Sequence, residues 1–198
     1  MKKIILLAGL FLATMGTNAQ TSTTEEGVVI NGVKWATRNV DAAGTFAETP
    51  ESAGKFYQWN RKTDWNATGD VTGWDKTTPG GTEWAEANDP SPEGWCVPTR
   101  EEIISLLDEE RVRSEWTTQN GVNGRKFIDK ETGNSIFLPA AGYRVRDKGT
   151  LNSPGSYGNY WSSAPIGIKE RYLGFDSGVA AVGNYGSAYG RNIRPVEK

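Results

Sequence analysis

The chain has 198 residues, a formal net charge of −2, one cysteine and no histidine. This length suits one domain, and the mildly acidic balance without a basic cluster excludes nucleic acid as an electrostatic partner. The missing histidine excludes Ser-His-Asp and Cys-His sites. The single cysteine excludes an internal disulfide, and the two features together argue against a zinc site.

The first nineteen residues have the three parts of a cleavable export signal. A lysine pair opens the segment, an apolar run follows over 4–15, and small residues close it at Thr17 and Ala19. The run is shorter than the ~20 residues needed to span a bilayer as a helix. We therefore predict a secreted, periplasmic or cell-surface protein without membrane insertion. Its parts are a signal peptide over 1–19, a flexible lead-in over 20–26 and a single domain over 27–198.

The first part of the domain is predicted to contain a hairpin, a helix and a long loop. Asn31-Gly32 between two β-branched runs is a strong hairpin signal. Residues 50–62 are predicted to be a helix, because Pro50 suits a first turn and three aromatic residues supply apolar bulk. The stretch 60–94 is rich in polar residues and glycine but holds three tryptophans, which predicts an ordered and often functional loop.

The rest of the domain is predicted to be one further helix followed by strands. Thr99-Arg100-Glu101-Glu102 is a capping box, so we expect a helix over 100–110. Expected strands lie at 124–129, 134–138, 157–163, 170–175, 179–182 and 190–196. Two helices combined with short antiparallel strands indicate an α+β fold.

Five segments, in this order, resemble a known family. They are Val33–Val40, Asn88–Glu102, Leu138–Arg144, Gly158–Ser163 and Gly190–Val196. Their order and spacing are similar to those of the Fibrobacter succinogenes major paralogous domain, whose members are typically exported proteins. The resemblance implies a C-type-lectin-like fold, distantly similar to formylglycine-generating enzymes, with two helices, a twisted antiparallel sheet and long ordered loops.

The chain departs from this family pattern at its cysteines. Ser91 stands where many members carry cysteine, and Cys96 stands where many carry arginine. The resemblance therefore implies no disulfide and a Cys96 that acts as a small buried apolar residue. Formylglycine chemistry needs paired cysteines, and the calcium–sugar motifs of animal lectins are missing, so the implied fold brings no ready-made site.

Aromatic and polar residues in and beside the long loop form the first candidate site. Exposed indole rings can stack on sugars, while neighbouring polar groups fix the ligand's orientation. The alternative is packing, because each buried tryptophan removes surface worth ~4–6 kcal/mol before entropy costs. The predicted ligand-binding residues are Trp59, Asn60, Arg61, Trp65, Asn66, Trp74 and Trp84.

A second candidate face consists of Trp161, Ser162, Ser163 and Arg194. The alternative role for these residues is to bridge buried loops, with Arg194 donating to carbonyl groups. We predict no catalytic residue, no metal ligand and no cofactor. Calcium, which needs only oxygen ligands, stays open but lacks a loop motif.

Three functions are compatible with these patterns. The leading one is an exported, monomeric, non-catalytic recognition domain that binds glycan or protein through the loop-rich aromatic face. The second is a carboxylate-driven glycan hydrolase, which needs two close carboxyl groups, one with a raised pKa; Glu83, Glu86 and Asp89 lie near Trp84. The third is a structural or tip subunit of a surface assembly, which predicts an exposed apolar patch or an open sheet edge.

Overall fold

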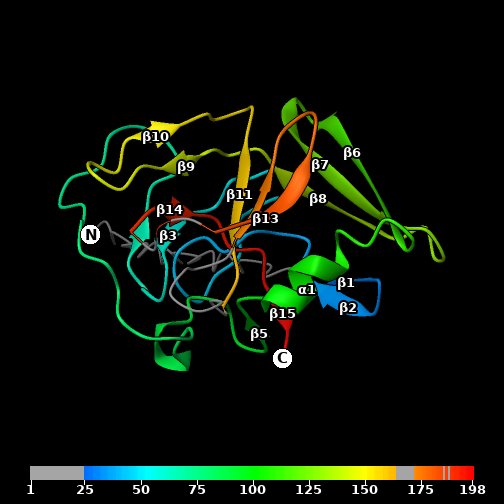
Figure 1. The fold of residues 1–198 in the computed structure, drawn as a ribbon, viewed down its shortest axis with the longest axis horizontal. Coiled ribbons are helices and arrows are strands. Elements are labelled where there is room, and N and C mark those ends of the chain that lie inside the picture. Colours follow the sequence, from blue (N-terminus) through cyan, green and yellow to red (C-terminus); the bar gives the residue numbers. More distant parts are fainter. Residues whose placement is uncertain (1–24, 164–171, 185, 187) are drawn as a thin grey trace, which may run out of the picture.

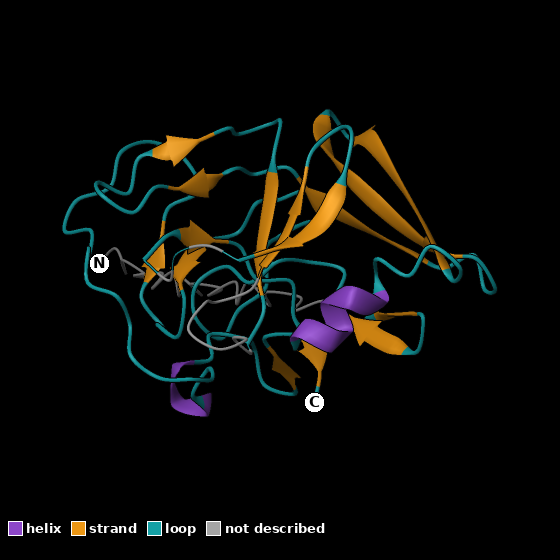
Figure 2. Cartoon of the chain, viewed as in Figure 1, coloured by secondary structure: helices purple, strands orange, loops and turns teal. Residues whose placement is uncertain are grey.

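The described part of the chain is built almost entirely from short strands (Figures 1 and 2). The computed structural model describes residues 25–163, 172–184, 186 and 188–198, so the predicted signal peptide and most of the lead-in lie outside the described residues. Within that described part, no helix has the length and apolarity to cross a membrane.

The strands form four small antiparallel sheets. The first contains β1 (Val28–Ile30), β2 (Val33–Trp35), β15 (Val196–Glu197) and β5 (Trp95–Cys96). The second contains β10 (Leu151–Asn152), β9 (Tyr143–Arg144), β14 (Gly190–Arg191), β3 (Phe56–Gln58) and β4 (Asp64–Trp65). The third contains β11 (Gly158–Trp161), β12 (Tyr172–Phe175) and β13 (Ala180–Gly183). The fourth contains β6 (Val112–Gln119), β7 (Val122–Asp129) and β8 (Ser135–Pro139).

The predicted α+β class with two helices is wrong, because the described chain is mostly β. Its helical elements are α1 (Arg100–Ser105) and a 3₁₀ turn, η1 (Glu86–Asn88). The helix expected over 50–62 is replaced by β3, which is buried on both faces. Tyr57 and Gln58 pair with β14 there, so tertiary pairing overrides local helix signals.

Helix α1 begins as predicted but ends early. The Thr99 hydroxyl accepts from the Glu102 N–H at 3.2 Å, and the Glu102 carboxylate accepts from the Thr99 N–H at 2.7 Å, which completes the capping box. Beyond Ser105 the backbone hydrogen bonds follow the i→i−3 pattern of a 3₁₀ turn, because the Leu106 N–H donates to the Ile103 carbonyl. The helix therefore stops five residues before the predicted end at 110.

Several strand predictions are confirmed. The hairpin of β1 and β2 turns through Asn31 and Gly32 with φ of 46° and 78°, the left-handed geometry of a tight hairpin turn. Strands β7, β8, β11, β12 and β13 lie within or close to the expected ranges, although residues 170 and 171 lie outside the described part. The eight-residue strand β6 was not predicted.

Two apolar clusters hold the sheets together. The first gathers side chains such as Trp35, Phe127 and Phe175 between the first, third and fourth sheets. The second gathers Tyr57, Trp59, Trp84 and Trp161 under the loop 60–94, together with other residues. The free thiol of Cys96 is half-buried against the first cluster, and burial raises its pKa to about 11, so it stays a neutral packing group.

Glu25 anchors the start of the described chain, and its contribution should depend on pH. Its carboxylate accepts from the Thr37 N–H at 2.7 Å and from Arg38 Nε at 2.8 Å. Burial raises the Glu25 pKa, but these bonds outweigh burial and hold it below the ordinary 4.5. The stabilisation is therefore complete above the unfolded-state pKa and is lost as the pH falls through the folded-state pKa.

We expect Glu25→Gln to lower the free energy of unfolding at neutral pH by about 1–2 kcal/mol, the value of a charge-assisted hydrogen bond. Urea denaturation at neutral pH and at a pH below the folded-state pKa would measure this, with the exposed neighbour Glu26→Gln as control. An equal deficit at both pH values would contradict the assigned role of the carboxylate.

Candidate functional site

The loop tryptophans predicted to bind ligand point into the protein. Trp59, Trp74 and Trp84 are 0%, 8% and 8% exposed, and their indole N–H groups donate to backbone carbonyls at 3.2, 2.8 and 3.0 Å. Trp65 is half-buried with its ring 4.8 Å from that of Trp74. These side chains pin the loop 60–94 to the sheets and leave no row of exposed indole faces.

Their polar neighbours are used within the loop as well. The Asn60 side chain accepts from the Ala85 N–H at 2.8 Å and donates to the Gly80 carbonyl at 3.1 Å. Arg61 pairs with Asp75 across the loop, and the Asn66 amide oxygen accepts from Lys55 Nζ at 2.7 Å. The first candidate set is therefore a stabilising network.

The second candidate face is also internal. Trp161 is fully buried and donates to the Tyr57 carbonyl at 2.7 Å. The backbone of Ser163 donates to Pro98 at 2.7 Å and accepts from Trp84 at 2.9 Å, and Ser162 is fully buried. These residues tie β11 to the loops on either side, as in the alternative role considered for them.

Arg194 is a buried cation that donates to carbonyl groups. It is 1% exposed, and burial lowers its pKa to about 10. Its nitrogens donate to Asn39 Oδ1 and to the carbonyls of Thr37 and Phe137, at 2.9, 2.6 and 3.1 Å. Arg194 thereby joins the segment after β2 to the end of β8.

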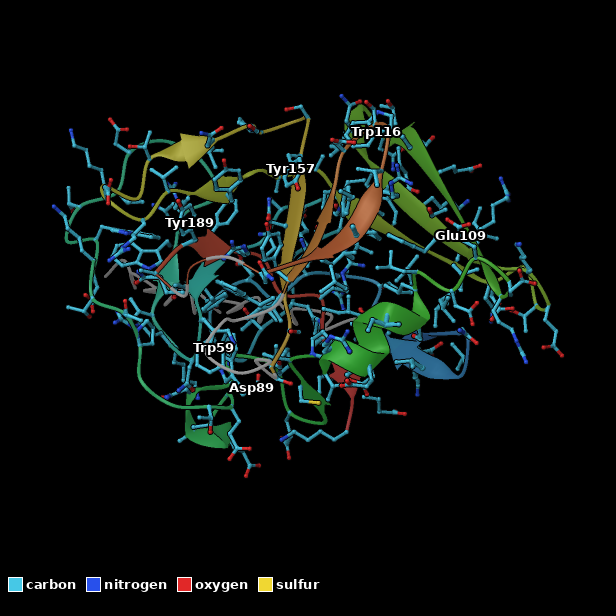
Figure 3. All side chains as sticks on the ribbon, viewed as in Figure 1. Trp59, Asp89, Glu109, Trp116, Tyr157 and Tyr189 are labelled. Atoms are coloured by element: carbon cyan, nitrogen blue, oxygen red, sulfur yellow. The ribbon has the colours of Figure 1, made fainter. Side chains whose placement is uncertain are left out.

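A pocket of about 250 Å³ opens where the second and third sheets meet. Strands β9, β11, β12 and β14 and the turn before β11 all contribute to it. Figure 3 labels Tyr157 in that turn and Tyr189, which directly precedes β14. Its described lining, which we call the tyrosine pocket, is Tyr143, Ser153, Tyr157, Asn159, Tyr172, Tyr189 and Arg191.

The tyrosine rings contact one another at the wall of the pocket. The ring of Tyr143 lies 6.3 Å from that of Tyr157 and 6.0 Å from that of Tyr189. Burial and neighbouring groups raise the pKa of Tyr157, so its hydroxyl keeps its proton and can donate a hydrogen bond. The wall thus combines apolar ring surface with phenolic donors and acceptors.

Arg191 and Asn159 form the polar base of the tyrosine pocket. The Arg191 guanidinium lies 4.0 Å from the ring centres of both Trp161 and Tyr172, which holds it by cation–π contact. Arg191 Nε donates to Asn159 Oδ1 at 3.4 Å. This bond leaves Asn159 Nδ2 as a donor without a hydrogen-bond partner in the described structure, although the residue is only 2% exposed. Such a donor costs about 1–3 kcal/mol unless another molecule accepts from it.

These pocket residues escaped the sequence analysis although three of them lie within its family-like segments. Tyr143, Asn159 and Arg191 belong to Leu138–Arg144, Gly158–Ser163 and Gly190–Val196. The analysis selected the neighbouring Trp161 and Arg194 instead. Asn159 and Trp161 are two positions apart in β11 and share a face, so strand alternation does not separate the two sets.

The described carboxyl groups with a resolved pKa shift include none with the raised pKa expected of a glycan hydrolase. Hydrogen bonds hold the pKa of every carboxyl with a resolved shift below its ordinary value, as for Asp129 and Asp176, whereas a glycosidase acid needs a raised pKa. Glu83 and Glu86 are exposed, and Asp89 accepts from the backbone of Val97 at 3.0 Å. No Asp or Glu is among the described residues that line the tyrosine pocket, and the same part of the chain holds no group of three or more potential metal ligands.

The surface of the described chain offers little for an assembly subunit. Among the described residues, the large apolar side chains that are exposed are Val29 and Val179, at 44% and 57%. Strand β6 has an open edge, but the ion pair between Arg113 and Glu115 lies on this strand, and edge charges oppose pairing with another sheet.

Comparison with known proteins gives one partial match. Residues 112–196 match the model of a family described as a domain of unknown function, DUF8237, over less than half of the chain. No curated protein and no solved structure matches significantly. The matched segment contains all seven described residues of the tyrosine pocket, so the pocket lies within the part of the chain that is similar to this family.

Proposed function

We propose that the protein is an exported, non-catalytic recognition domain that binds a glycan in the tyrosine pocket. Sugar rings present apolar C–H faces that pack on aromatic side chains and hydroxyl groups that exchange hydrogen bonds with polar ones. The pocket supplies both. It is smaller than the ~300–1,000 Å³ of pockets for drug-sized ligands, which favours a single terminal sugar ring.

The unpartnered amide of Asn159 carries this proposal. A buried donor at the base of a pocket is unfavourable in the free protein and favourable when a ligand oxygen accepts from it. Asn159 lines the pocket and its Oδ1 accepts from Arg191, so Nδ2 is the group of this side chain that lacks an acceptor in the described structure. A sugar hydroxyl or ring oxygen is an acceptor of this kind. Export, predicted from residues 1–19, would place such a domain among extracellular glycans.

A glycan array followed by affinity measurements tests the proposal. We expect Tyr157→Phe, which removes one hydroxyl and keeps the ring, to weaken binding of an array hit about three- to tenfold, as for one lost hydrogen bond. Tyr143→Ala, which also removes ring contacts, should weaken it by at least about tenfold.

Trp65→Phe serves as the control, because it changes the loop first predicted to bind and leaves the tyrosine pocket intact. Its affinity should equal that of the unchanged protein. An array without hits, or a hit weakened by Trp65→Phe and not by the tyrosine variants, would contradict the proposal.

A further inference from the structure

A second cavity lies on the opposite side of the third sheet, outside the tyrosine pocket. It has a volume of about 440 Å³ and is lined by residues of β6 and β7, the turn joining β12 to β13 and the end of α1. We call it the arginine cleft and define it by Arg125, Lys130, Leu107 and Val179. Glu109, labelled in Figure 3, also lines this region.

Arg125 is the buried cation of this cleft, and its hydrogen bonds are incomplete. It is 6% exposed and donates to Ser114 Oγ and to the Asp176 carbonyl, both at 2.9 Å. Its Nε has no partner in the described structure, and no described carboxylate forms an ion pair with it. A guanidinium has five N–H donors, so several remain unused.

Two other buried arginines show what complete bonding looks like in this protein. Arg144 donates from Nε to Asn66 at 2.9 Å, from Nη1 to Gly149 at 2.6 Å and from Nη2 to further carbonyls. Arg194 likewise has an acceptor for each nitrogen. Neither lines a described cavity. Arg125, whose Nε lacks an acceptor, thus lines a cleft, whereas these two arginines with an acceptor for each nitrogen do not.

Besides Arg125, the lining has two cationic residues, Arg113 and Lys130, one acidic residue, Glu109, and apolar surface. Lys130 lies at the cleft with its ammonium group 2.5 Å from the Glu109 carbonyl, so its contact there is with a neutral acceptor. Leu106, Leu107 and Val179 add apolar surface. Burial lowers the pKa of Arg125, which means that its charge is poorly solvated and would gain from a bound anion.

We propose that the arginine cleft binds a carboxylate carried on a short aliphatic body. The guanidinium fork matches the planar geometry of a carboxylate, Lys130 adds attraction, and the leucine and valine side chains cover the aliphatic part. This site is separate from the tyrosine pocket and does not depend on glycan binding there.

Calorimetric titration of the protein with hexanoate tests this site. Hexanamide, which has the same body without the charge, and acetate, which has the charge without the body, are the ligand controls. We expect saturable binding of hexanoate and binding at least about tenfold weaker for each control, since a hydrogen bond to a charged group and the buried methylenes each contribute about that much.

Variants at Val179, Arg125 and Tyr157 show where hexanoate binds. Val179→Glu places a negative charge at the exposed mouth of the cleft and should weaken hexanoate at least about tenfold, whereas Val179→Gln should stay within about threefold. Arg125→Gln should weaken it similarly. Tyr157→Phe should leave it unchanged, which separates this site from the tyrosine pocket. Absence of saturable binding, or hexanoate affinity unaffected by both Val179→Glu and Arg125→Gln, would overturn the proposal.

Discussion

Replacing Arg194 with methionine is expected to lower the free energy of unfolding by about 4 kcal/mol or more. Methionine fills part of the volume but leaves buried acceptors at Asn39, Thr37 and Phe137 without a donor. Each unsatisfied buried polar group costs about 1–3 kcal/mol, and breaking a buried charged network costs ~3–5 kcal/mol. Urea denaturation at neutral pH measures the loss, which is large enough to unfold a marginal domain.

Arg113→Met is the matched control for this prediction. The Arg113 side chain is 58% exposed and pairs with Glu115 at the surface. Exposed ion pairs contribute little, so the expected change is within about 0.5 kcal/mol. Similar losses in the two variants, or a loss below about 1 kcal/mol for Arg194→Met, would show that the carbonyl network does not hold the fold.

Gly142→Ala is the second substitution with a large expected effect, at least about 3 kcal/mol. Gly142 has φ of +80°, and a Cβ there would lie 2.2 Å from the backbone oxygen of Asn152. That oxygen belongs to the last residue of β10, directly before Ser153, and Gly142 itself donates to the Tyr157 carbonyl at 2.7 Å. Relief of the overlap would move two walls of the tyrosine pocket, so glycan affinity should fall together with stability.

Gly133→Ala separates steric overlap from backbone strain. Gly133 has a similar φ of +76°, but a Cβ there meets nothing within 4 Å. Gly133→Ala should therefore lower the free energy of unfolding only by the cost of the left-handed conformation, about 1–2 kcal/mol. Equal unfolding free energies for the two alanine variants would contradict the close packing assigned to Gly142.

Local signals with their own chemistry were the predictable part of this fold. The Asn31-Gly32 hairpin and the Thr99 capping box depend on a few neighbouring residues, and both are confirmed. A second signal of this kind, Asn120-Gly121 with φ of 47° and 82°, joins β6 to β7. Recognising it would have predicted β6, because the residues before it pair with β7 along eight positions.

Features set by distant partners could not be predicted. The segment after Gly54 forms a strand because β14, more than a hundred residues later, pairs with it. The order of the first two sheets likewise depends on the end of the chain, because β15 lies between β2 and β5, and β14 lies between β9 and β3. Propensity within a window does not contain this information.

The burial of the loop tryptophans could not be predicted for a related reason. The sequence shows that Trp59, Trp74 and Trp84 are large and aromatic, but not that they face the interior. The tyrosine pocket gathers residues from four strands, the turn before β11 and the position before β14, and only the fold brings them together. The similarity to the Fibrobacter succinogenes major paralogous domain stays a prediction, and so does the export signal.

Mapping a bound oligosaccharide by nuclear magnetic resonance tests the central claim most directly. The isotope-labelled protein would be titrated with an array hit, and backbone and side-chain amide shifts followed. We predict that the largest changes include the Asn159 side-chain amide and the backbone of β9, β11, β12 and β14. Changes confined to the loop 60–94, with the Asn159 amide unaffected, would contradict the assignment of ligand binding to the tyrosine pocket.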